Sequence, residues 1–198
     1  MTPRLVLASA SPVRRRVLIE AGFAPEVIVS GVNEDDVSGP TDEVALMLAE
    51  RKAQAVAKHI EGSALVLGGD TVLDVDGDTR GKPVSLDQAR AWWVSVAGRT
   101  GTLHSGLCVI DTGRGRQASG VATTIVHYGK PTGRELDAYL ATGEPLAVAG
   151  GFTIDGYAAP FVDSIAGDHG AVLGLSLPLL RRLLAEIDIE ITDLWDRP

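Results

Sequence analysis

Short runs rich in apolar and β-branched residues alternate along this chain with longer stretches in which apolar residues recur every three or four positions. The runs 4–8 and 64–68 are typical of buried strands. Residues 42–60 are typical of a long helix, which Thr41 would cap and Gly62 would end. Such an alternation of strands and helices predicts an α/β fold.

A hairpin pattern adds antiparallel strands to that sheet. Residues 102–111 and 118–128 flank the sequence TGRGR, which is typical of a tight turn between two paired strands. Another strand is expected through residues 161–165, and Ser176 would cap a last helix. We therefore expect a mixed sheet flanked by helices.

The length and the charge of the chain limit its partners. A chain of 198 residues suits a single domain over 1–198, with room for two lobes around a cleft. With 26 acidic and 18 basic residues, its formal net charge is −8. We expect neither nucleic acid nor a membrane surface as a partner, because both require a basic face. An anionic substrate must then be attracted by a local basic site.

Nothing in the sequence predicts export or a disulfide framework. The apolar stretch near the N-terminus is too short for a signal peptide, and no stretch approaches the roughly 20 apolar residues of a membrane span. Cys108 stands alone in the apolar run LCVI, which is typical of a small buried core residue. We expect a cytoplasmic protein.

The junction LVLASASPVRRRVL is the first candidate site. A helix that begins after Ser11 would present free backbone N–H groups, and the hydroxyls of Ser9 and Ser11 would add donors. Arg14 lies beside the apolar stripe of this helix and can reach inward, whereas Arg15 and Arg16 are expected to face water. Amides and guanidinium groups together suit a polyphosphate. The alternative is a capped surface helix with a solvated basic turn.

Lys52 is the second candidate, because it lies within the apolar stripe of the long helix, four residues from both Leu48 and Val56. A lysine in such a place either extends its ammonium group out to water or meets an anion, since burial without a partner is costly. The first outcome is the commoner one. The second would place the lysine in a phosphate-binding cleft.

The run LVLGGDTVLD is the third candidate. We expect its strand to end at Gly68–Gly69, with Asp70 and Thr71 directly after it, where α/β sheets carry chemistry. The glycines would let a ligand or metal approach the backbone. Asp70 could bind a hard cation or accept a proton from water, and Glu34 in the acidic run 33–36 could be a second carboxylate. A plain turn aspartate is the alternative.

Lys82 lies in GDTRGKP, which has only a superficial likeness to a P-loop. The spacing between Gly77 and Gly81 is too short, and Pro83 stands where a magnesium-binding serine or threonine is needed. Lys82 can still reach a phosphate as a mobile cation. The sequence has no HExxH pattern and no GxSxG pattern, so a zinc hydrolase and a serine hydrolase of those kinds are not expected.

Several short motifs, taken in order, make the chain resemble the Maf family of nucleotide pyrophosphatases over essentially its whole length. They are Ser9-Ala10-Ser11-Pro12 with Arg14, Glu34, Leu48-Ala49-Glu50-Arg51-Lys52-Ala53, Gly68-Gly69-Asp70-Thr71, Gly81-Lys82-Pro83, Gly98-Arg99-Thr100, Thr142-Gly143-Glu144-Pro145, Ala149-Gly150-Gly151-Phe152 and Gly174-Leu175-Ser176.

This resemblance implies an elongated mixed sheet flanked by helices, in two lobes around a deep nucleotide-binding cleft, as in Maf and ITPase-like proteins. It implies hydrolysis of the bond between the α- and β-phosphates of canonical or modified nucleoside triphosphates, which yields a monophosphate and pyrophosphate. It further implies a magnesium or manganese cofactor, a house-cleaning role toward non-standard nucleotides, and a homodimer.

The resemblance also assigns roles to residues. Asp70 is the water-activating base, Glu34 is a second catalytic carboxylate, and both are candidate metal ligands. The phosphates are held by Ser9, Arg14, Lys52 and Lys82, the last of which we count among the catalytic residues. Thr71 helps to set the choice of substrate.

Three positions depart from the family pattern. Val13 replaces an arginine and Gly101 replaces a histidine. Asp155 stands where the pyrimidine-preferring branch has a pocket glutamine. An ionised aspartate only accepts hydrogen bonds, so in the pocket Asp155 would favour bases that present a donor. Its alternative role is a local turn hydrogen bond before Gly156.

Two other functions stay open. One is a phosphohydrolase that releases orthophosphate from the γ position. The other is a non-catalytic, nucleotide-binding regulator of cell division arrest. Such a regulator would need Arg14 and Lys52 but could lack Asp70 and Glu34.

Overall fold

The computed structural model describes residues 3–34 and 36–196, and its elements follow the α/β order expected from the sequence. The first half contains β1 (Leu5–Leu7), α1 (Pro12–Glu20), β2 (Glu26–Val27), α2 (Thr41–Ala57), β3 (Leu65–Val75), β4 (Asp78–Arg80) and α3 (Leu86–Val96). The second half contains β5 (Thr100–Asp111), β6 (Arg116–Tyr128), α4 (Gly133–Ala141), η1 (Glu144–Ala147), η2 (Ala149–Gly151), η3 (Ala159–Phe161), β7 (Val162–Ala166), α5 (His169–Val172), α6 (Leu177–Glu186) and η4 (Ile191–Leu194).

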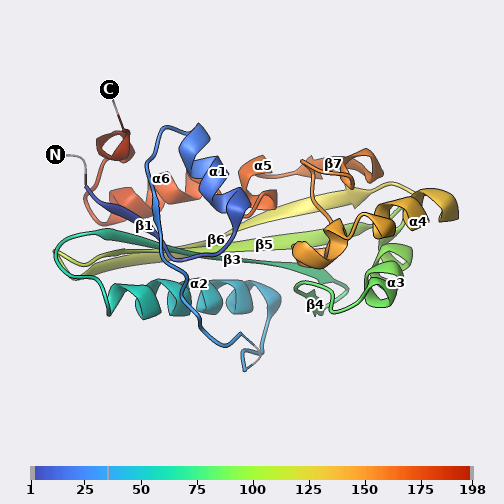
Figure 1. Cartoon of the computed structure of the whole chain (residues 1–198), viewed down its shortest axis with the longest axis horizontal. Helices are drawn as coiled ribbons and strands as arrows, with labels where there is room; N and C mark the ends of the chain where they lie inside the picture. The colour runs from blue at the N-terminus through green and yellow to red at the C-terminus, as the bar shows by residue number, and fades with distance from the viewer. Residues whose placement is uncertain (1–2, 35, 197–198) are drawn as a thin grey trace.

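The strands form one mixed sheet of seven strands in the order β2-β1-β3-β5-β6-β7, with β4 paired to β3. The strands β1, β2 and β3 are parallel to one another, whereas β5 and β6 form the expected antiparallel hairpin beside β3. Figure 1 shows α2 on one face of the sheet and α1, α5 and α6 on the other. The prediction of a mixed sheet flanked by helices is confirmed.

Strand β3 is longer than the sequence suggested. It runs through Gly68, Gly69, Asp70 and Thr71 to Val75, so the expected strand end at Gly68–Gly69 is wrong. Asp70 lies opposite Gly106 of β5. Glycine and aspartate are poor strand formers, but the ladder to β5 supplies the backbone hydrogen bonds that keep these residues extended.

The helix starts confirm some sequence signals and correct one. Ser11 caps α1, with its hydroxyl accepting from the backbone N–H of Arg14, and Ser176 caps α6 in the same way. Thr41 is the first residue of α2 and does not cap it, because its hydroxyl binds Asp74 and Thr79 instead. This helix ends at Ala57, earlier than expected.

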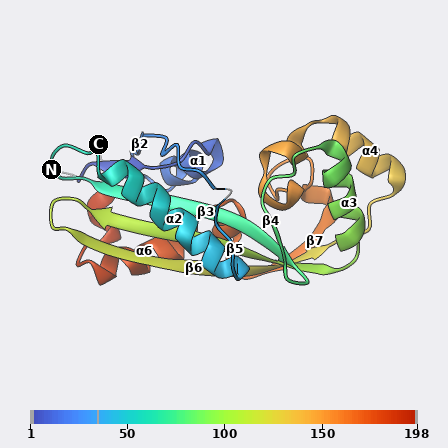
Figure 2. The ribbon, with the colours of Figure 1, turned by 90° about the horizontal axis from the view of Figure 1, so that it is seen from below.

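The apolar core divides into separate clusters, and two of them correspond to the two lobes visible in Figure 2. One lobe is built on β1, α1 and α6, and its core includes Leu18 and Leu180. The other contains α3 and α4, and its core includes Trp93, Tyr139 and Phe152. The long strands β3, β5 and β6 run through both lobes. Among the described residues, no helix is long and apolar enough to span a membrane.

Candidate active site

The site lies where β3 changes partner on one of its edges. Strand β1 pairs with β3 only as far as Leu67, and β4 begins to pair with it at Leu73. Between these points, no strand of the described residues covers this edge. Asp70 and Thr71 lie in this interval, with their side chains on opposite faces of the sheet because side chains alternate along a strand. A ligand at this opening can therefore be reached by groups from both faces.

On one face, α2 lies against the sheet at very short range. A Cβ atom at Gly68 would stand 2.2 Å from the carbonyl oxygen of Ala49, and one at Gly106 would stand 2.3 Å from that of Ala45. Gly68 is therefore required for the close packing of α2 on the sheet. The helix fills the space beside this glycine, so the interpretation that Gly68 lets a ligand or metal approach the backbone is wrong. The close approach brings the side chains of α2 directly over Asp70.

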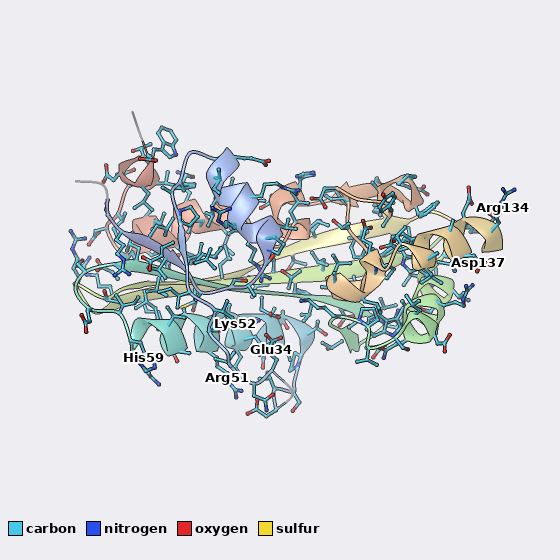
Figure 3. The ribbon with its side chains drawn as sticks, viewed as in Figure 1. Glu34, Arg51, Lys52, His59, Arg134 and Asp137 are labelled. Atoms are coloured by element: carbon cyan, nitrogen blue, oxygen red, sulfur yellow. The ribbon has the colours of Figure 1, made fainter. Side chains whose placement is uncertain are left out.

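Lys52 joins the two predicted carboxylates. Its ammonium nitrogen lies 2.5 Å from Oδ1 of Asp70 and 2.7 Å from Oε1 of Glu34. The side chains of Lys52 and Asp70 are 9% and 10% exposed, whereas that of Glu34 is 53% exposed. Figure 3 shows Lys52 and Glu34 beneath the sheet, on the side of α2. Lys52 thus meets anions and does not extend into water, which was the less common of the two expected outcomes.

Burial raises the pKa of Asp70 above its ordinary value, although Lys52 and Arg14 act in the opposite direction. The nearby Glu34 raises it further. A carboxylate with a raised pKa accepts a proton more readily than a free aspartate does. The environment therefore suits Asp70 to the role of a general base.

Arg14 lies on the other face and is also buried. Its Nε donates to the carbonyl oxygen of Gly174 at 2.7 Å, while its two terminal nitrogens donate to Ser9 Oγ at 3.0 Å and to Thr71 Oγ1 at 3.1 Å. Burial lowers the pKa of Arg14, and the charge of Asp70 opposes that effect. The guanidinium group is thus held rigidly beside the open edge of β3.

The segment directly before α1 supplies neutral donors next to this arginine. The hydroxyl of Ser11 accepts from the backbone N–H of Arg14, and Ser9 Oγ accepts from the backbone N–H of Ser11. Both hydroxyls keep a hydrogen that can be donated. A helix N-terminus with such groups is suited to a phosphate.

Lys82 is not brought into contact with Asp70 or Glu34. It is exposed, in a turn between β4 and α3, and among the described residues no ion pair joins it to the site. The backbone N–H of Gly150 donates to the carbonyl oxygen of Gly81 at 2.8 Å and so fixes the base of this turn. The role of Lys82 stays a prediction.

Asp155 is also separate from the Asp70 cluster. Its carboxylate accepts hydrogen bonds from Thr153 and Arg16, so the local turn hydrogen bond foreseen as its alternative role is present. Arg16 is exposed, as expected, and it also pairs with Asp155, a residue 139 positions away. Whether Asp155 reads the base stays a prediction.

Sequence reasoning missed two members of the site. Gly174 was noted only as part of a motif, yet its carbonyl oxygen orients Arg14. Ser105 is buried on β5 behind Thr71, with the two hydroxyl oxygens 3.4 Å apart. A glycine that precedes a serine-capped helix was a signal for the first, whereas no local pattern marked the second.

A divalent cation fits the two carboxylates chemically. Glu34 and Asp70 converge on one point, now held by the lysine nitrogen, and carboxylate oxygens are preferred ligands of magnesium and manganese. Among residues 3–34 and 36–196, no group of three or more histidine, cysteine or acidic residues could hold a metal. A cation here would need phosphate or water oxygens to complete its coordination, as is usual for magnesium.

The amino-acid sequence is similar to those of proteins in one known family. A family model described as Maf-like protein matches residues 4–187, so the chain belongs to the Maf family. It is 57% identical to a nucleoside triphosphate pyrophosphatase of Streptomyces coelicolor, over 98% of each chain. A protein of the same name from Streptomyces avermitilis is 55% identical, over 97% of this chain and 94% of that one. A third, from Salinispora tropica, is 53% identical, over 98% of this chain and 88% of that one.

Proposed function

We propose that this protein hydrolyses nucleoside triphosphates to a nucleoside monophosphate and pyrophosphate. The observation that carries the proposal is the buried contact between Lys52 and Asp70 beside Glu34, with Arg14 facing the same opening of β3. This arrangement combines a base and fixed cations within a member of the Maf family. Relatives that bear the name nucleoside triphosphate pyrophosphatase support the choice of substrate.

The polyphosphate would lie along the open edge of β3. Arg14 and the first turn of α1 would bind it from one face, while Lys52 would reach it from the other. Lys82 would add a third cation from its exposed turn. These groups are charged or polar before the reaction begins, so they would contribute to substrate binding as well as to the chemical step.

Asp70 would act on the water that attacks. Its carboxylate accepts one proton from water while the water oxygen forms a new bond to phosphorus, and the bond between the α- and β-phosphates breaks. Arg14 and Lys52 stabilise the negative charge that moves to the leaving phosphate oxygens. A magnesium or manganese ion held by Glu34 and Asp70 would supply further charge neutralisation when bound.

A screen of nucleotides tests the proposal. Canonical and modified nucleoside triphosphates are each incubated with the protein and magnesium or manganese, and pyrophosphate is measured. We expect pyrophosphate from at least one nucleotide, with the release abolished by excess chelator and restored by the metal. A set of nucleotides that bind without any turnover would instead support the nucleotide-binding regulator.

The house-cleaning role, a homodimer and a cytoplasmic location belong to the same proposal. A preference for modified over canonical nucleotides in the screen would support the first. Light scattering during size-exclusion chromatography measures the mass of the particle and decides the second. Fractionation of the source cells decides the third.

A further inference from the structure

The ion pair between Arg16 and Asp155 joins two lobes that otherwise have separate cores. Arg16 lies on α1, whose Leu18 belongs to the core of the first lobe. Asp155 follows Phe152, which belongs to the core of the second lobe. Among the ion pairs of the described residues, this is the one that connects these two cores.

The charged groups of Arg16 and Asp155 are both engaged in this ion pair. Asp155 uses one carboxylate oxygen for Arg16 and the other for Thr153 in its own segment. Among the ion pairs of the residues that the structure describes, Arg16 has one other acidic partner, Glu20, whose nearest carboxylate oxygen lies 3.8 Å away on the same helix. The guanidinium group therefore reaches across to the second lobe and is not satisfied within α1.

The segment that carries Asp155 is itself firmly held in the second lobe. Trp93 and Tyr139 both donate hydrogen bonds to the carbonyl oxygen of Gly151, at 2.9 and 3.0 Å. Glu144 accepts from the backbone N–H groups of Tyr157 and Ala158. These hydrogen bonds fix the segment that carries Asp155 to the rest of the second lobe, so Asp155 and the lobe keep a constant relative position. On the other side, Arg16 is two residues from Arg14, which is fixed at the site.

We propose that Arg16 is a positioning residue, which holds Asp155 and the second lobe against α1 and thereby sets the width of the opening beside Arg14. The effect on catalysis rests on the proposed function, whereas the effect on the spacing of the lobes does not. Because the charges of Arg16 and Asp155 neutralise each other, a base near Asp155 meets a guanidinium–carboxylate pair and not a free carboxylate.

Distance measurement between the lobes tests the proposal independently of activity. Spin labels are attached to Arg134→Cys on α4 and Arg181→Cys on α6, which are both exposed, while the native Cys108 is buried and stays unlabelled. Pulsed electron–electron double resonance then gives the distribution of distances between the two labels. We expect Arg16→Gln and Asp155→Asn each to shift or broaden this distribution.

Two further variants make the test specific. Arg15→Gln removes the neighbouring exposed arginine and should leave the distribution as in the parent protein. The charge-reversed pair Arg16→Asp with Asp155→Arg should restore it. Loss of the pair should also lower kcat/KM, by up to about a hundredfold if the phosphate groups move by about 1 Å, and the reversed pair should recover a part of that loss.

Distributions that are identical in the parent, Arg16→Gln and Asp155→Asn proteins would overturn the proposal, whatever the activities. A changed distribution of label distances, with no measurable turnover in any protein, would support the positioning role of Arg16 and would count against the proposed function alone. Thermal unfolding of each variant should stay close to that of the parent, because a partly exposed pair contributes little to stability.

Discussion

Gly68→Ala places a methyl group where α2 lies closest to the sheet. The new Cβ would stand 2.2 Å from the carbonyl oxygen of Ala49 and 2.7 Å from the backbone nitrogen of Ala53. These are backbone atoms of a helix, which no side-chain rotation can move away, so the whole helix must shift. An extra methyl group in a close-packed core costs about 1–3 kcal/mol, and we expect the upper end of that range.

Whether Gly68→Ala lowers or raises the free energy of unfolding tests the close contact between α2 and β3. Without the clash, alanine in place of a strand glycine would stabilise the fold by roughly 0.5–1 kcal/mol. A shift of α2 also moves Lys52 away from Asp70, so the activity should fall together with the free energy of unfolding.

Urea unfolding, followed by tryptophan fluorescence, measures that free energy. Gly133→Ala is the matched control, because a Cβ at this first residue of α4 meets nothing within 4 Å. The control should be neutral or slightly stabilising. A Gly68→Ala protein as stable as the parent would refute the close contact between α2 and β3.

The other predictions concern the charged groups and the cysteine. Asp70→Asn should lower kcat by roughly 10²–10⁴-fold while nucleotide affinity, measured by calorimetry, stays nearly unchanged; turnover near the parent rate would show that Asp70 is not the base. Because the base must be ionised and its pKa is raised, kcat/KM should fall as the pH drops through a midpoint above the usual aspartate range; a midpoint in the ordinary range would contradict this assignment. Arg14→Ala should weaken nucleotide binding in the same calorimetric assay, since its guanidinium meets phosphates that are already charged, and an unchanged affinity would count against it. Burial raises the pKa of Cys108 to about 12, so iodoacetamide at pH 8 should modify it only in denaturant, as read by mass spectrometry; rapid modification of the folded protein would show that the thiol is accessible.

Local signals in the sequence were sufficient for much of the fold. Ser11 and Ser176 cap their helices as their positions predicted, because capping depends on residues within one turn. The hairpin of β5 and β6 forms around its predicted turn for the same reason. Lys52 was marked as unusual by its place in an apolar stripe, and it is indeed buried against carboxylates.

Features that depend on distant segments could not be derived in this way. Strand β3 continues through Gly68 and Asp70 because β5 pairs with it, and no local propensity indicates this. Thr41 binds Asp74 and Thr79 because the sheet brings them to the start of α2. The pairing of Arg16 with a residue of the other lobe likewise follows from tertiary structure alone.

The identity of the first products tests the central claim most directly. Phosphorus-31 NMR during turnover of an accepted triphosphate follows every phosphorus-containing species in one sample. We predict that monophosphate and pyrophosphate appear together in equal amounts, with no diphosphate intermediate, and that Asp70→Asn produces both at least about a hundredfold more slowly. Diphosphate and orthophosphate as first products, or an Asp70→Asn protein that releases pyrophosphate at the parent rate, would contradict the account.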